Sequence, residues 1–179
     1  FDLGYDPMSE CAIIPVRNMW GELLGVTRRS LSHRASIRYR DPKGFKKRNN
    51  LFGSWFVAQA ESPTVVLTEG PLDCIKVWQA GHPAVAVYGS YVSEHQIMLL
   101  RRMGVVSCIL MFDNDKAGIK AIKQCKGFSE DNEGKWTYNP ITDLRKFFVL
   151  KSASYKGVDA GADPGDMTDE QIDKAVTSA

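Results

Sequence analysis

The chain has 179 residues, 44% of them hydrophobic, and a formal net charge of +2 at pH 7, which is enough material for one sizeable core or for a large domain with a small lobe. It contains neither the roughly 18 to 20 uncharged apolar residues of a membrane helix nor the basic and then apolar start of a signal peptide. We therefore expect a soluble cytoplasmic protein without a membrane partner. Because it starts at Phe1 rather than methionine, we expect a piece of a longer protein.

The four cysteines are widely spaced and form no Cys-x-x-Cys pair, and the three histidines lie in unrelated contexts. A structural zinc site is therefore not expected. Cys74 and Cys108 lie inside apolar runs, so reduced thiols that behave as small hydrophobic side chains are the expectation.

Positive charge is concentrated near the start of the chain. Between Arg17 and Arg48 there are ten Lys and Arg against two acids, Glu22 and Asp41, so the remainder is net acidic. This asymmetry predicts a basic lobe that meets phosphates and an acidic part that could hold metal ions.

The first predicted elements are two short strands, residues 11–16 and 23–27, which form an antiparallel hairpin around a turn at 18–21. Residues 28–50 are polar and basic with few apolar anchors. We expect that segment to be a lobe or loop outside the core.

The central part repeats a strand-then-helix plan. Expected strands are 64–68, 84–90, 105–113 and 147–150, and expected helices are 72–80, 93–103, 117–124 and one starting near 168. Ser93 followed by Gln96 is typical of a capping box. Near-continuous apolar strands that alternate with helices predict an α/β fold with a parallel sheet covered on both faces. Residues 126–143 are polar and turn-rich and are expected to be an exposed insertion.

Carboxylates follow three of the predicted strands: Glu69 after the first, Asp113 and Asp115 after the third, Asp163 and Asp166 after the fourth. These loops share one edge of a parallel sheet, where ligands bind. Gathered carboxylates repel one another, and a bound cation relieves the repulsion; all-oxygen ligands suit Mg²⁺ or Mn²⁺. Taken singly, each has a plainer interpretation, because a glutamate can cap a helix, Asp-x-Asp also follows strands in sugar-nucleotide transferases and aspartate phosphatases, and Asp-Pro-Gly-Asp is a common turn.

In combination, EGPLD, FDNDKAG and DPGD resemble the signature of the Toprim family, which includes primases, topoisomerases and some nucleases. The resemblance implies that Glu69 acts in acid-base chemistry or metal binding and that Asp113 and Asp115 are catalytic metal ligands. Asp163 and Asp166 match the last acidic pair of primases, with one extra residue between them, so either could hold the metal.

The N-terminal third resembles bacterial and phage primases of the DnaG type. IIPVRN followed by LLGVTRRSL is similar to a primase hairpin, and FKKRNNLFG is similar to a later primase segment. The resemblance implies a small basic α+β lobe, residues 1–60, in front of a Toprim catalytic domain, residues 61–179. Lys47 and Arg38 are expected to bind the nucleotide. The residues expected to bind nucleic acid are Arg17, Arg28, Arg29 and Arg34.

The resemblance thus predicts the RNA polymerase core of a DNA primase, a nucleotidyltransferase of DNA replication that makes short RNA primers. Mg²⁺ or Mn²⁺ is its expected cofactor, and single-stranded DNA and ribonucleoside triphosphates are its expected partners, with a replicative helicase reached through absent regions. The short insertion and the Asp-Asn-Asp form favour a phage or mobile-element origin. A Toprim nuclease and a non-catalytic module that binds metal and nucleic acid stay open. For the basic segment, a merely solvated surface is the alternative.

Overall fold

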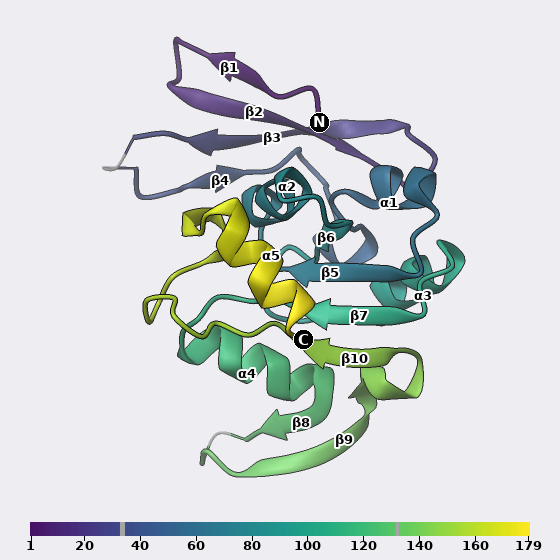
Figure 1. Cartoon of the computed structure of the whole chain (residues 1–179). Helices are drawn as coiled ribbons and strands as arrows, with labels where there is room; N and C mark the ends of the chain where they lie inside the picture. Colours follow the sequence, from purple (N-terminus) through teal and green to yellow (C-terminus); the bar gives the residue numbers. More distant parts are fainter. Residues whose placement is uncertain (33–34, 132) are drawn as a thin grey trace.

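The computed structural model describes residues 1–32, 35–131 and 133–179. This part of the chain contains three sheets and the helices that pack on them (Figure 1). The first sheet is antiparallel and the second is parallel, each with four strands, and the third is a two-stranded hairpin. The α/β class, with a parallel sheet flanked by helices, is therefore confirmed.

The antiparallel sheet has the strand order β1-β2-β3-β4. Its predicted hairpin is present, with Asn18 in the turn accepting hydrogen bonds from two backbone N–H groups through its side-chain oxygen. Two short strands, β1 and β4, were not expected. The bounds are β1 Gly4–Asp6, β2 Cys11–Arg17, β3 Leu23–Ser30 and β4 Tyr39–Arg40.

The parallel sheet has the strand order β10-β7-β5-β6. The second expected strand, 84–90, ends early because Tyr88 and Gly89 adopt positive φ angles of 61° and 145°, which turn the chain away from the sheet. The fourth begins two residues later than expected, after a short helical turn. The bounds are β5 Thr64–Thr68, β6 Ala84–Ala86, β7 Ser107–Leu110 and β10 Val149–Ser152.

Helices cover both faces of the parallel sheet (Figure 1). Successive residues of β5 alternate between two apolar clusters, with Val65 and Leu67 in one and Val66 in the other. The first cluster includes side chains of α3 and α4, and the second includes side chains of α2 and α5. Burial on both faces explains why these strands are near-continuous apolar runs.

The helices begin close to where the sequence predicts, except for α1, which was not expected. The predicted capping box is present, since Ser93 and Gln96 each accept the other's backbone N–H through a side-chain oxygen, at 3.2 and 3.0 Å. The bounds are α1 Ser54–Ala60, α2 Pro71–Gln79, α3 Glu94–Arg102, α4 Lys116–Cys125 and α5 Asp169–Thr177, with short 3₁₀ turns at η1 Lys47–Asn49, η2 Leu144–Lys146 and η3 Pro164–Asp166.

The segment 126–143, expected as a turn-rich insertion, contains the hairpin of β8 (Lys126–Glu130) and β9 (Trp136–Asp143). Its alternating polar and aromatic residues suit a two-stranded sheet with one face on α4 and much of the other in solvent. The hairpin lies at the edge of the molecule, below α4 in the view of Figure 1.

The segment between the two larger sheets joins them physically. Phe52 pairs with Ala86 of β6, and the side chains of Leu51 and Val57 are buried in the core of the parallel sheet. A division near residue 60 remains a proposal, and these contacts tie α1 to the parallel sheet.

All four cysteines are unpaired and buried, as expected for small apolar side chains, and burial raises the pKa of the Cys108 thiol to about 12. No helix in the described ranges combines the length and the apolar character needed to cross a membrane.

Candidate active site

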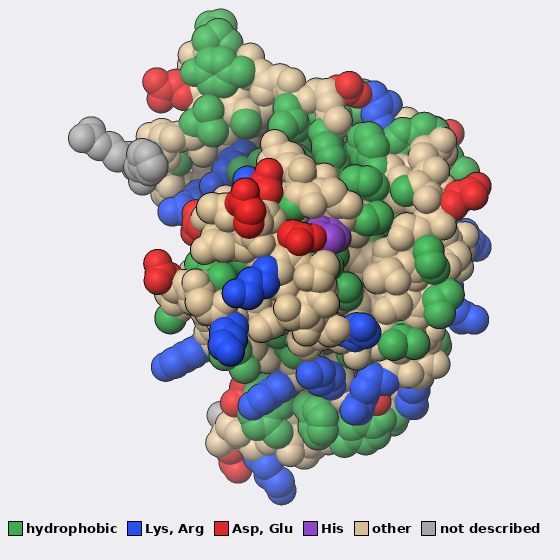
Figure 2. Space-filling view, viewed as in Figure 1, with side chains coloured by type: hydrophobic (Ala, Val, Ile, Leu, Met, Phe, Trp, Pro, Cys, Tyr) green, Lys and Arg blue, Asp and Glu red, His purple; other side chains and the backbone are tan. Residues whose placement is uncertain are grey.

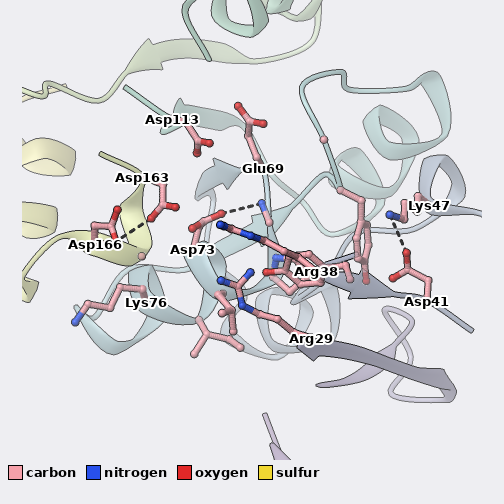
Figure 3. A pocket seen from close by; sticks show the side chains of 18 of the residues that line it. Arg29, Arg38, Asp41, Lys47, Glu69, Asp73, Lys76, Asp113, Asp163 and Asp166 are labelled. Carbon is pink, nitrogen blue, oxygen red and sulfur yellow. Dashed lines mark hydrogen bonds and ion pairs between the residues drawn. The ribbon is translucent and has the colours of Figure 1, made fainter. Parts of the chain in front are cut away.

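A cleft of about 550 Å³ opens at the carboxyl ends of the parallel strands, opposite β3 and β4 of the antiparallel sheet. Acidic side chains line the side formed by the parallel sheet, and basic side chains line the other (Figure 3). The acids of the first side are Glu69, Asp73, Asp113, Asp163 and Asp166, with Lys76 of α2 beside them. The bases of the other side are Arg29, Arg38 and Lys47, and Asp41 lies there paired with Lys47. The cleft therefore brings together two groups of opposite charge that lie far apart in the sequence.

Glu69 directly follows β5, where the strand end projects it into the cleft. Its pKa is raised to about 7, first by burial and then by the neighbouring carboxylates Asp113 and Asp115, against a backbone hydrogen bond from Asp113 that lowers it. Among the described residues, Oε1 of Glu69 is one of the few buried side-chain atoms without a hydrogen-bond partner. A buried carboxylate oxygen without a donor is costly, and a cation would satisfy it.

Asp113 follows β7 and faces the same space as Glu69 (Figure 3). Its pKa is raised to about 6 by burial first and then by Asp163, Asp115 and Asp166. Because Glu69, Asp113 and Asp163 all line the cleft, carboxylates from three separate motifs lie around one space and repel one another.

Asp115 has a structural role that the sequence pattern did not predict. It is the N-cap of α4, and its Oδ1 accepts the backbone N–H of Gly118 at 2.8 Å. It does not line the cleft, although its charge reaches Glu69 and Asp113. Oδ1 of Asp115 therefore stabilises the first turn of α4.

Asn114, between the two aspartates, fastens their loop to the segment before Asp163. Its backbone N–H donates to Ala162 at 2.9 Å, its carbonyl accepts from Gly161 at 2.7 Å, and its side chain donates to the carbonyl of Asp159 at 3.0 Å. These three hydrogen bonds explain how the last acidic pair reaches the site.

Asp163 is the N-cap of η3, and Asp166 is its last residue. Oδ1 of Asp163 accepts the backbone N–H of Asp166 at 3.0 Å, so the pair forms the capped turn that the motif predicts by itself. Both also line the cleft. The two aspartates therefore form a turn and line the cleft at the same time.

Sequence analysis missed Asp73, in the first turn of α2. Its Oδ2 accepts the backbone N–H of Gly70 at 3.0 Å, and burial, then Asp163 and Asp113, raise its pKa to about 7. A backbone hydrogen bond from Gly165 acts in the opposite direction. The sequence contained a signal for this residue, because Asp73 is the last residue of the motif EGPLD, which begins at Glu69.

The opposite wall carries the cations. The Arg29 guanidinium lies 4.9 Å from the ring centroid of Tyr39, and Figure 3 shows Arg38 extending toward Asp73. Lys47 forms an ion pair with Asp41 at 2.7 Å. On the acidic side of the cleft, Lys76 of α2 pairs with Asp169 at 2.7 Å.

Arg17 and Arg28, two further predicted basic residues, do not line this cleft. Arg17 donates to the carbonyl of Gly21 at 2.9 Å and lies 3.5 Å from Asp2. Arg28 lines a separate cavity of about 250 Å³ with Arg38 and Arg40. Arg34 lies outside the described residues.

Comparison with known proteins agrees with this geometry. A family model described as Toprim-like matches residues 66–142. The DNA primase of Deinococcus radiodurans is 34% identical over 125 residues, and that of Chlamydia pneumoniae is 31% identical over 116 residues. The chain is a relative of the DnaG-type primases and contains a Toprim domain.

Solved structures of this family share the fold. The Aquifex aeolicus primase, with its zinc-binding and RNA polymerase domains, aligns with a TM-score of 0.71 and 23% identity over 94% of this chain and 40% of that one. A DnaG primase catalytic domain bound to single-stranded DNA aligns with a TM-score of 0.69 and 22% identity over 99% of this chain and 56% of that one.

The Toprim match and the curated relatives cover different shares of the molecule. Glu69, Asp113 and Asp115 lie inside the matched Toprim segment, and Asp163 and Asp166 follow it. The two primases named above align with 65% and 61% of this chain, which spans 21% and 20% of their length.

The Toprim carboxylates suit Mg²⁺, which the family generally uses. In the described ranges no three His, Cys, Asp or Glu side chains converge closely enough to enclose an ion by themselves. Mg²⁺ is usually held by one or two carboxylates, with water and substrate phosphates completing its shell. Glu69 with Asp113, and Asp113 with Asp163, are the neighbouring pairs that fit this requirement, and the unpaired oxygen of Glu69 supports the first.

Proposed function

We propose that the chain is the catalytic core of a DNA primase, which makes short RNA primers on single-stranded DNA by metal-dependent nucleotidyl transfer. The observation that carries this proposal is the cleft itself, in which five carboxylates face Arg29, Arg38 and Lys47. Such a site can hold a divalent cation and a triphosphate together, because each wall attracts one of them.

In this proposal Asp113 and Asp163 hold the cation, with Asp115 and Asp166 adding negative charge. A bound Mg²⁺ or Mn²⁺ would supply charge neutralisation on the triphosphate and polarise the reacting oxygens. The primer 3′-hydroxyl attacks the α-phosphorus of the incoming nucleotide, and pyrophosphate leaves. Glu69 accepts the hydroxyl proton or shares in holding the cation, and a pKa of about 7 suits proton transfer at neutral pH.

Lys47 and Arg38 are proposed to contact the triphosphate. The ion pair with Asp41 fixes Lys47 at the edge of the cleft, and Thr27 holds Asp41 through a 2.8 Å hydrogen bond. Arg29 is proposed to contact the template where it enters the cleft. Arg17 and Arg28 would contact template phosphates outside it, where affinity comes from charge without sequence readout.

The proposed partners are single-stranded DNA and ribonucleoside triphosphates, and a replicative helicase reached through other parts of a longer protein. One structural neighbour is a DnaG primase catalytic domain bound to single-stranded DNA, which supports the first of these. Such an enzyme would act in the cytoplasm of a bacterial cell or a phage-infected host.

The test is incorporation of labelled ribonucleotides on mixed-sequence single-stranded DNA with Mg²⁺ or Mn²⁺. We expect metal-dependent oligoribonucleotides from the native chain and a loss of about 100-fold or more in Glu69→Gln and Asp113→Asn. Asp173→Asn is the matched control, since Asp173 lies on α5 outside the cleft and should leave synthesis unchanged.

The alternatives give different products in the same assay. A Toprim nuclease would shorten the template without synthesis. A non-catalytic module would bind metal and DNA without either product. Undiminished synthesis by Glu69→Gln would remove the proposed role of that residue.

A further inference from the structure

A stripe of lysines on α4 leads from the acidic site toward the hairpin of β8 and β9. Lys116, Ile119, Lys120 and Lys123 are exposed and are spaced three or four residues apart, so they lie on one face of the helix. No acid occurs between Lys116 and Cys125. The stripe is about 10 Å long at 1.5 Å per residue, and it begins directly after the N-cap Asp115.

The hairpin continues this stripe with aromatic rings. Phe128 and Tyr138 are cross-strand partners, with ring centroids 5.9 Å apart, and are 38% and 52% exposed. Trp136 lies on the same strand face as Tyr138, and Nζ of Lys123 is 4.6 Å from its ring centroid. Two exposed rings, and a half-buried third ring beside an ammonium group, are not explained by the core, to which α4 contributes Ala121 and Cys125 from its buried side.

The charges around these rings favour an anionic ligand. In Figure 2, Lys and Arg side chains gather over α4 and the adjoining hairpin, with hydrophobic side chains among them. Lys120 pairs with Glu130 at 2.8 Å, and Arg145 pairs with Asp143 at 2.8 Å.

The other two acids of the hairpin, Asp131 and Glu133, belong to its turn, where Asp131 accepts the backbone N–H of Glu133 at 3.0 Å. They therefore lie at the tip, beyond the aromatic rings.

We propose that the lysine face of α4 together with Phe128, Trp136 and Tyr138 binds the single-stranded DNA template on the side of the cleft opposite the basic sheet. Phosphates would lie along the lysines and bases would stack on the exposed rings, which is how single strands are bound without sequence preference. A protein partner is less well matched, because charged residues are depleted from the centres of protein interfaces. The inference rests on the proposed function in taking the template as the ligand.

The test measures binding alone, by anisotropy of a fluorescein-labelled oligothymidine of roughly 30 nucleotides, longer than the single-fold site sizes of such proteins, in EDTA without nucleotides. In Lys120→Gln/Lys123→Gln we expect affinity to fall roughly 3- to 10-fold, and the slope of log K against log salt to become shallower by about 1.4, the value for two lost phosphate contacts. Phe128→Leu keeps an apolar contact to Tyr138 and should weaken binding about 5-fold through lost stacking.

Two further variants test the direction of the effect. Glu130→Gln frees Lys120 from its ion pair and should strengthen binding about 2-fold. Lys151→Gln/Lys174→Gln removes the same charge from β10 and α5 and should leave the salt slope unchanged. Thermal melts establish that each variant is folded.

Wild-type affinity and salt slope in the α4 double variant would overturn the proposal, as would an equal loss in the Lys151/Lys174 control. A surface that serves a protein partner would give the first of these results. Because the assay contains no nucleotide or metal, a chain that binds DNA through this surface but makes no primers would refute the proposed function and leave this inference standing.

Discussion

Asp115 shows how one side chain can combine two roles, because it caps α4 and also adds charge to the acidic site. Asp115→Ala removes both, whereas Asp115→Asn keeps an oxygen that can cap the helix. We expect the alanine variant to lose about 1 kcal/mol of the free energy of unfolding and the asparagine variant to lose almost none. Urea unfolding measures this difference.

The catalytic role is then read from the asparagine variant alone. If the charge of Asp115 serves the metal, Asp115→Asn should be stable and should show metal-dependent primer synthesis lowered by about 10-fold or more. Full synthesis by this variant would leave Asp115 with its capping role only.

At the scale of elements, Gly118 determines how α4 joins β7. A Cβ on Gly118 would collide with the carbonyl oxygen of Asp113, so only glycine lets the first turn of the helix pack on the loop that carries Asp113. We expect Gly118→Ala to lower the free energy of unfolding by about 1 to 3 kcal/mol and to weaken Mg²⁺ binding, because the loop has to move. Urea unfolding and calorimetric Mg²⁺ titration measure both effects.

The matched substitution on the same helix is Ile119→Ala. Its side chain is 53% exposed, so the variant should change the free energy of unfolding by no more than about 0.5 kcal/mol. Equal stability of the Gly118 and Ile119 variants would contradict the close approach that the structure shows.

At the scale of the whole molecule, strong periodicity made the parallel sheet, its helices and the acidic edge predictable from the sequence. Short elements such as β1, β4 and α1 were not, because a few residues carry too little pattern to distinguish a strand or helix from a loop. The early end of β6 was also not predictable, because nothing in the residue type of Tyr88 indicates its positive φ angle.

The site was predicted in part for a similar reason. Chain order after each strand gave Glu69, Asp113 and Asp163, since parallel topology brings strand ends together. Asp73 was missed because it comes from inside a helix, and its closeness to Asp163 depends on tertiary packing. Arg17 and Arg28 were predicted to bind nucleic acid together with Arg29, yet of these three only Arg29 lines the cleft.

The gathered acids make the stability of the whole fold depend on pH and metal. Without metal, the pKa values of Glu69 and Asp73 are raised to about 7 and that of Asp113 to about 6, so the folded state keeps protons that the unfolded state releases above about pH 4. The free energy of unfolding should therefore fall as pH rises from about 4 to about 7. Asp143, whose pKa Arg145 lowers to about 2, acts in the opposite sense only below that window.

Mg²⁺ binds the ionised carboxylates, so its stabilising effect should be larger at pH 8 than at pH 5. Thermal melts in EDTA and in Mg²⁺ at both pH values measure this, and Glu69→Gln/Asp73→Asn should flatten the pH dependence in EDTA because two of the three raised groups are gone. A melting temperature in EDTA that rises from pH 5 to pH 8, or an Mg²⁺ effect that is equal at both, would show that these carboxylates do not form one electrostatic unit.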